Sequence, residues 1–369
     1  MRRRHVWAVA GLLAVLGSWT YFFPKAPRLG PLAQLEPSRS SPMIVFVPHS
    51  DDEVLAAGGL IQQMTNSGSP PQVVLVTGGD GFKLGAEARY KGRPTPSMMM
   101  DYARHRLGES KEALSRLGLP PDKFTFLGFP DQGLHRLWLE CWAANPCTSA
   151  TTQAGKVPYS EAWRPAAPYT GEELEGEIRD LLRAARPAVV VYPHPNEAHV
   201  DHWALSNFVS AALEDLRRTE PDWTPPEEWF YLVHRGDWPA PKGYRPQDPL
   251  LPPASMASGM TTWHERSLTP EQVQKKDQAL LAYQSQVSLM RRYLTSFVRT
   301  NELFGTIDRV QLPTPLMLPG QAPLNGPPWR NLAWAEVITD PRADTMARGV
   351  ERGADAGGVW AARDATTLW

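Results

Sequence analysis

The feature that most constrains the fold is the alternation of short apolar runs with longer stretches of helical periodicity. The runs resemble strands buried on both faces of a parallel sheet. They lie at Met43–Val47, Val73–Thr77, Phe124–Leu127 and Val189–Tyr192, with a fifth expected at Trp229–Val233. The helix-period stretches cover about 54–65, 100–117, 171–185 and 202–217. This alternation predicts an α/β protein with a doubly wound, mostly parallel, Rossmann-like sheet.

The C-terminal part of the chain departs from this pattern. Thr269–Thr300 is expected to form one long helix, because its Thr-Pro-Glu-Gln start is typical of a helix N-terminus with Pro270 in the first turn. The chain then becomes Pro-rich and apolar without a period. We expect residues 306–369 to form a Pro-rich extension with a small β annex, in which Val359–Ala362 and Thr366–Trp369 pair as a hairpin.

The N-terminus predicts export or membrane anchoring. Met-Arg-Arg-Arg-His precedes an apolar run, Val6–Phe23, which ends at Pro24. A basic flank before such a run is what a signal anchor or a signal peptide requires. Residues 1–24 are therefore expected to be an anchor, with a cleaved signal as the alternative, and residues 25–41 a Pro- and Ser-rich linker. The protein would then be membrane-anchored or secreted, with its catalytic part outside the cytoplasm.

Cysteine content and charge limit the classes that remain. Cys141 and Cys147 would close a small loop as a disulfide in an exported protein, and two reduced thiols are the alternative. A pair of cysteines at this spacing does not match a Cys-based zinc site. The net charge is −1, which does not indicate nucleic-acid binding. With 369 residues, 42% of them hydrophobic, the chain can bury a large core.

Polar clusters follow two of the expected strands. The first cluster contains His49, Asp51, Asp52 and Glu53, and the second contains His194, His199, Asp201 and His202. The carboxyl ends of parallel strands share one edge of a sheet, where ligands bind. Imidazoles with a carboxylate, and a further carboxylate beside them, are what a zinc hydrolase needs.

The first cluster also has a purely structural interpretation. Ser50-Asp51-Asp52-Glu53 is a capping box, and acidic residues at a helix N-terminus are favoured by the helix dipole. Capping explains neither His49 nor the second cluster at another strand end. The pair of clusters therefore favours a metal site.

These residues resemble a known family. Pro48-His49-Ser50-Asp51-Asp52-Glu53 is similar to the His-Pro-Asp-Asp-Glu motif of the PIG-L/LmbE-like N-acetylglucosaminyl deacetylases, and His199-Val-Asp-His202 is similar to their His-x-Asp-His motif. Weaker matches are Arg106-Leu-Gly-Glu109, Phe126-Leu-Gly-Phe-Pro-Asp131 and Lys276 with Ser285-Gln286. The resemblance assigns residues 42–305 to such a domain. Ser50 departs from the family's usual Pro, which removes a rigid turn residue but no ligand.

The resemblance implies a zinc site formed by His49, Asp52 and His202, with water completing the coordination. Asp51 would be the general base that takes the proton of the attacking water and returns it to the leaving amine. His199 would donate a hydrogen bond to the oxyanion of the tetrahedral intermediate.

Other positions have roles that are less specific. Asp201 would orient one of the imidazoles. Arg106 and Asp131 match positions expected to bind sugar hydroxyls, and a structural ion pair and a loop cap are the alternatives for them. His194 competes with His202 as the third ligand, and Glu197 is an alternative base. Divalent ions other than zinc also suit imidazole and carboxylate ligands.

The sequence therefore predicts a zinc-dependent amidohydrolase that removes the acetyl group from an N-acetylglucosamine-type sugar in a glycan or glycoconjugate. One alternative is the same chemistry on a small thiol-sugar or a glycolipid precursor. Another is a non-catalytic glycan-binding protein with the same fold. The expected partners are an amino-sugar substrate and, through the N-terminal segment, a membrane, with no nucleic acid.

Overall fold

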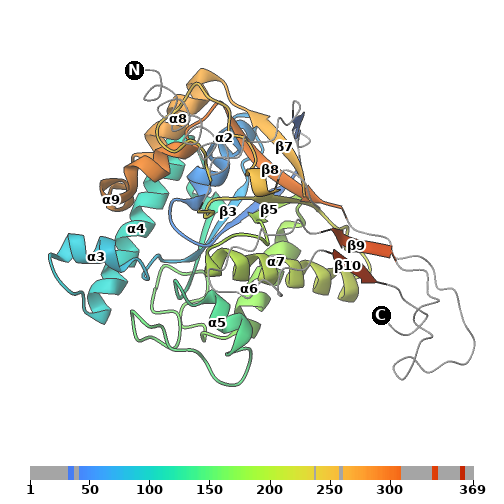
Figure 1. The fold of residues 1–369 in the computed structure, drawn as a ribbon. Coiled ribbons are helices and arrows are strands. Elements are labelled where there is room, and N and C mark those ends of the chain that lie inside the picture. Colours follow the sequence, from blue (N-terminus) through green and yellow to red (C-terminus); the bar gives the residue numbers. More distant parts are fainter. Residues whose placement is uncertain are drawn as a thin grey trace, which may run out of the picture.

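A computed structural model describes residues 32–36, 41–236, 238–256, 261–308, 335–339 and 358–361. Its centre is a mixed eight-stranded sheet with helices on both faces (Figure 1). The strands are β1 (Ala33–Gln34), β2 (Met43–Val47), β3 (Gln72–Thr77), β4 (Phe124–Phe129), β5 (Val189–Pro193), β6 (Glu227–Tyr231), β7 (Thr261–Ser267) and β8 (Asn301–Ile307). The helices are α2 (Asp52–Asn66), α3 (Lys83–Tyr90), α4 (Pro96–Leu117), α5 (Leu134–Leu139), α6 (Gly171–Ala185), α7 (Val200–Thr219), α8 (Pro270–Leu280) and α9 (Gln284–Leu294).

The sheet confirms the predicted doubly wound α/β fold. Its strand order is β1-β7-β8-β6-β5-β2-β3-β4. The five neighbouring strands β6, β5, β2, β3 and β4 are all parallel. The chain builds β2, β3 and β4 in one direction and then returns to add β5 and β6 on the other side of β2. The point where the order reverses lies between β2 and β5, and ligands bind at such points in open α/β sheets.

The five expected strands are all present, and β2 and β5 are buried along their whole length. Hydrophobic side chains on both faces meet helices, because α2, α4 and α8 pack together on one face and α5, α6 and α7 on the other (Figure 1). The expected helices are present as α2, α4, α6 and α7. Burial on both faces explains why these strands are continuous apolar runs.

The single long helix expected at Thr269–Thr300 is wrong. Its start is as predicted, with Thr269 and Gln272 forming a capping box and Pro270 in the first turn. The helix ends at Leu280, and α9 begins at Gln284. Between them the buried Tyr283 donates its hydroxyl hydrogen bond to Glu53 Oε1 at 2.6 Å. Both helices have helical composition, so local periodicity does not reveal the break.

Strands β7 and β8 were not predicted from the sequence. They pair antiparallel over seven residue pairs and join the sheet beside β6. Thr261–Ser267 consists largely of polar residues, and only Trp263 in it is buried. A strand with so little apolar pattern gives no periodic signal. Its place in the sheet comes from its pairing with β8.

The two cysteines close a loop that contacts the start of α6. Cys141 and Cys147 are disulfide-bonded, so the disulfide alternative holds. The carbonyls of Cys141 and Trp142 accept the first N–H groups of α6, from Gly171 at 2.9 Å and Glu172 at 2.8 Å. The bonded loop therefore caps that helix.

The annex hairpin differs from the expected one. Strand β10 (Gly358–Ala361) pairs antiparallel with β9 (Ala335–Thr339), while the expected partner, Thr366–Trp369, lies outside the described residues. The expected anchor at residues 1–24 also lies outside them, as does most of the linker at 25–41. Within the described ranges, no helix has the length and apolar character to cross a membrane.

Candidate metal centre

The two polar clusters meet at the edge of the sheet where β2 and β5 end. His49 follows β2, and Asp52 is the first residue of α2. His202 lies in the first turn of α7, which His199 caps by accepting the N–H of Asp201. The two strand–helix turns at the switch point thus bring residues from distant parts of the sequence together.

His49, Asp52 and His202 converge on one carboxylate oxygen. His49 Nδ1 lies 3.2 Å from Asp52 Oδ2, and His202 Nε2 lies 3.0 Å from the same oxygen. All three side chains are buried. Ligand atoms at about 2.0–2.1 Å from a tetrahedral zinc lie about 3.3 Å apart. The observed spacing suits one shared ion.

Carboxylates hold the far side of both imidazoles. His49 Nε2 lies 3.2 Å from Asp131 Oδ1 and 3.3 Å from Asp201 Oδ2. His202 Nδ1 lies 3.3 Å from Glu197 Oε1. A carboxylate on the second ring nitrogen fixes the tautomer and orientation of metal-binding histidines. The nitrogens facing Asp52 are therefore the ones left for an ion.

A fourth residue, His234, completes the cluster and was missed from the sequence. Its Nε2 lies 3.6 Å from Asp52 Oδ1, and its ring centroid lies 4.6 Å from that of His202. One ligand atom from each of His49, Asp52, His202 and His234 lies within 4.8 Å of the others. His234 follows β6, whose parallel neighbour is β5. A histidine after the expected strand at Trp229–Val233 was the available signal.

The electrostatics of the cluster favour positive charge. Burial opposes the charge on His202, but the carboxylates of Asp52 and Glu197 raise the pKa of His202 to about 9. Burial likewise opposes the Asp52 carboxylate, yet the facing His202, together with His234 and His49, holds the pKa of Asp52 well below its ordinary value. Surplus carboxylates that pull protons onto imidazoles would also attract a cation, and metal binding releases those protons.

Orphaned buried atoms also fit an ion. Within the described residues, Asp52 Oδ1 and both ring nitrogens of His202 lack a hydrogen-bond partner of good geometry. Buried polar atoms are normally satisfied, so such atoms require an explanation. Imidazole nitrogen with carboxylate oxygen is a donor set typical of zinc and similar divalent ions. The residues fit the cofactor that the sequence predicts.

Asp51 and His199, the two residues expected to take part in the reaction, lie beside the cluster. Asp51 is buried, and burial and the adjacent Asp52 carboxylate raise the pKa of Asp51 well above its ordinary value. The ring centroid of His199 lies 4.6 Å from that of His49. Because His199 Nδ1 accepts the N–H of Asp201 at 3.2 Å, its proton resides on Nε2, which can donate. Burial lowers the pKa of His199 to about 3, so the ring is neutral.

The model of the PIG-L family, described as GlcNAc-PI de-N-acetylase, matches residues 44–213. That span contains both polar clusters. The resemblance to this family that the sequence motifs predicted is confirmed over residues 44–213. No curated protein sequence matches the chain significantly. His234 lies beyond the part that matches.

Several solved structures resemble the chain. The A40926 pseudoaglycone deacetylase Dbv21 is 18% identical, with 73% of this chain and 98% of that chain covered and a TM-score of 0.47. N,N'-diacetylchitobiose deacetylase from Pyrococcus horikoshii is 17% identical, with 72% of this chain and 82% of that chain covered and a TM-score of 0.44. GalB, the 4-carboxy-2-hydroxymuconate hydratase from Pseudomonas putida KT2440, is 16% identical, with 73% of this chain and 98% of that chain covered and a TM-score of 0.43.

Arg106, within the PIG-L match, is buried and turned toward the backbone. Its Nη2 donates to the Ser50 carbonyl at 2.7 Å and its Nη1 to the Gly79 carbonyl at 3.1 Å. Asp131 contacts His49 and accepts the N–H of Gly81 at 2.8 Å. Both residues therefore hold loops of the site, and their expected contact with sugar hydroxyls stays a prediction.

The two competing residues have other contacts. His194 Nε2 pairs with Thr261 Oγ1 at 2.8 Å, and its Nδ1 accepts the N–H of Asn196 at 3.0 Å. Burial lowers the pKa of His194 to about 4. His194 is not part of the four-residue cluster. Glu197 Oε1 accepts backbone N–H groups of Val233 and His234 and faces His202, which makes it an orienting group in this geometry.

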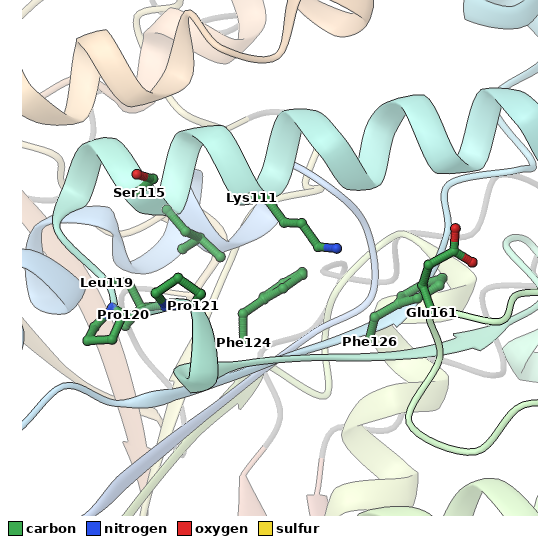
Figure 2. Close-up of a pocket in the computed structure, with 9 residues that line it drawn as sticks. Lys111, Ser115, Leu119, Pro120, Pro121, Phe124, Phe126 and Glu161 are labelled. Carbon is green, nitrogen blue, oxygen red and sulfur yellow. The ribbon is translucent and has the colours of Figure 1, made fainter.

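A cavity lies between α4 and β4, away from the cluster. Its volume is about 400 Å³, and its lining includes Phe124, Phe126, Lys111 and Glu161. Figure 2 shows the two phenylalanines of β4 beneath α4, which carries Lys111. None of the cluster residues lines it.

Proposed function

We propose that this chain is a metal-dependent N-deacetylase that hydrolyses the acetamide of an N-acetylglucosamine-type sugar in a glycan or glycoconjugate. The observation that carries the proposal is the convergence of His49 Nδ1 and His202 Nε2 on one oxygen of Asp52, at 3.2 and 3.0 Å. The PIG-L match, described as a de-N-acetylase, supports the same reaction. Zinc is the proposed ion, with these three residues among its ligands.

A divalent ion in this site would supply Lewis-acid chemistry and make water a nucleophile near neutral pH. Asp51, next to the ligand Asp52, accepts the proton of the attacking water. The water oxygen bonds to the acetyl carbon. Asp51 then returns the proton to the nitrogen as the carbon–nitrogen bond breaks, so the products are acetic acid and a free amine.

His199 stabilises the negative charge that forms on the substrate during the reaction. As the amide carbonyl is attacked, negative charge develops on its oxygen. A neutral imidazole with its proton on Nε2 donates a hydrogen bond to that oxygen. Asp201 keeps the site in register, because its Oδ2 faces His49 Nε2 at 3.3 Å and its Oδ1 accepts the N–H of Leu134 at 3.0 Å.

We also propose that the catalytic domain acts outside the cytoplasm, tethered or released through residues 1–24. Two observations support this location. The basic and apolar N-terminal sequence is typical of exported chains. The Cys141–Cys147 disulfide is typical of an oxidising compartment.

The first test measures free amine released from N-acetylglucosamine oligomers. We expect activity that disappears with a chelator and returns on adding Zn²⁺. The Asp51→Asn variant should lose about 10²–10⁴-fold in kcat, the range for a missing acid–base group, with metal content unchanged. The exposed Asp101→Asn variant is the matched control. Activity that persists without metal, or is equal in Asp51→Asn and wild type, would refute the proposal.

A further inference from the structure

Three features of the structure single out His234. It is the one cluster member whose side chain is substantially exposed, at 31%, whereas those of Asp52 and His202 are fully buried. It lies outside the residues matched by the PIG-L model. Its Nε2 faces Asp52 Oδ1, the oxygen that His49 and His202 do not use.

The backbone around His234 is tightly held. Glu197 Oε1 accepts the N–H groups of Val233 and His234, and the His234 carbonyl accepts the N–H of Ala198 at 2.9 Å. The hydroxyl of Tyr293 donates to the Val233 carbonyl. The Tyr293 ring also stacks on the His234 ring, with centroids 6.1 Å apart and planes 26° apart. A side chain held in this way is positioned before any ligand arrives.

The separation between His234 and Asp52 is informative. At 3.6 Å, Nε2 and Oδ1 are too far apart for a hydrogen bond, and Oδ1 has no such partner within the described residues. The distance is close to the spacing of about 3.3 Å between two ligands of one zinc ion. One ion would satisfy both atoms.

We propose that His234 is a fourth protein ligand of the metal, so that the resting donor set is three imidazoles and one carboxylate. This inference rests on the proposed function, because it concerns the same ion. Glu197 then serves two ligands at once, since it faces His202 Nδ1 and holds the backbone of His234. Of these four side chains, that of His234 is the most exposed to solvent.

The test is metal binding, independent of turnover. Full-length wild type and the His234→Ala and His264→Ala variants are stripped of metal and titrated with Zn²⁺ against a chromophoric chelator, and Co²⁺ spectra are recorded. His264 is the control because it lies on β7, where its Nε2 pairs with Thr306 Oγ1 at 2.9 Å. Loss of an orienting contact weakens metal binding about 10–100-fold, so loss of a ligand should exceed about 100-fold. His264→Ala should bind as wild type does.

A His234→Cys variant tests contact directly. If position 234 reaches the ion, its Co²⁺ form gains a thiolate-to-cobalt charge-transfer band that wild type lacks, and this readout holds even if His234→Ala misfolds. Zn²⁺ affinity and Co²⁺ spectra of His234→Ala equal to wild type, or no new band in His234→Cys, would overturn the inference while leaving the proposed function intact. A wild type that binds no ion would refute both proposals.

Discussion

Asp51 adopts a backbone conformation that residues other than glycine rarely adopt, with φ 110° and ψ −31°. Neighbouring contacts impose it. The Asp51 N–H donates to Glu53 Oε2 at 3.0 Å, and the preceding Ser50 carbonyl accepts from Arg106. Strained residues persist where the surrounding structure overdetermines them, as it often does at active sites. This backbone conformation places the adjacent carboxylates of Asp52 and Asp51 in different environments. Asp52 lies among the proposed ligands, and Asp51 lies beside them.

Gly79 shows how closely Arg106 is packed. Gly79 has φ +68°, and a Cβ added there would lie 2.1 Å from Arg106 Nη1. We expect Gly79→Ala to lower the free energy of unfolding by about 2 kcal/mol or more, because the left-handed conformation costs about 1 kcal/mol and the guanidinium must also move. Denaturant unfolding measures this loss, and the activity should fall with it.

Gly68→Ala is the matched control for that variant. Gly68 has φ +84°, but an added Cβ would meet no atom within 4 Å. It should therefore lose only the conformational part, about 1 kcal/mol. Equal losses in the two variants would show that the contact with Arg106 contributes nothing.

At the scale of elements, α2 is joined to α8 and β8 by a buried ion pair. The helix is interrupted at Ala57, with φ −138° and ψ 17°. The carboxylate of Glu302 in β8 accepts the N–H groups of Gly59 at 2.6 Å and Leu60 at 2.9 Å. Lys276 of α8 donates to the same carboxylate at 2.6 Å and to the Leu55 carbonyl at 3.0 Å. The pair therefore satisfies the backbone groups that the interruption leaves unpaired.

Lys276→Met should destabilise the protein by about 3–5 kcal/mol, because it leaves the buried Glu302 charge without a partner. Chemical unfolding measures the change. Lys275→Met, on the same helix, removes the same charge and should have a much smaller effect. Adding Glu302→Gln to Lys276→Met should recover part of the loss. If Lys276→Met and Lys275→Met were equally stable, the ion pair between Lys276 and Glu302 would not contribute to the stability of α2.

At the scale of the whole molecule, the site exists only because the sheet brings several strand ends to one edge. His49 follows β2, Asp131 follows β4, His202 lies beyond β5 and His234 follows β6. Each loop contributes one or two side chains, and no single loop holds a complete ligand set. The stability of the domain and its activity are therefore coupled.

Global stability should depend on pH through Glu177 in α6. Its side chain is fully buried, and neither carboxyl oxygen has a hydrogen-bond partner within the described part of the chain. Burial raises the pKa of Glu177 from 4.5 to about 8, although Arg164 opposes the shift. The folded protein therefore keeps a proton that the unfolded chain has already lost. This contribution is complete below pH 4.5 and is lost as the pH rises to about 8.

We expect Glu177→Gln to remove this pH dependence. Relative to wild type, the variant should gain stability between pH 5 and pH 8.5, on the order of 3 kcal/mol. Urea unfolding at the two pH values measures the difference. Glu172→Gln, exposed on the same helix, should follow wild type at both. A wild type and a Glu177→Gln variant with parallel pH profiles would contradict the assigned burial effect.

Local sequence patterns were enough to predict the five parallel strands β2 to β6, the helices α2, α4, α6 and α7, and the two clusters at the ends of β2 and β5. These follow from local patterns: hydrophobic periodicity specifies an element, and the ends of parallel strands meet at one edge. On that basis the two clusters could be placed at one edge of the sheet, and the resemblance to the PIG-L family then singled out His49, Asp52 and His202 as the expected ligands.

Features that depend on contacts between distant segments could not be predicted from local sequence patterns. The break before Tyr283 coincides with its long-range hydrogen bond to Glu53, and β7 belongs to the sheet because it pairs with β8. His234 joins the cluster because β6 lies beside β5 and Glu197 holds its backbone. A lone histidine after a strand carries no local pattern, because its partners are set by strand order and long-range hydrogen bonds.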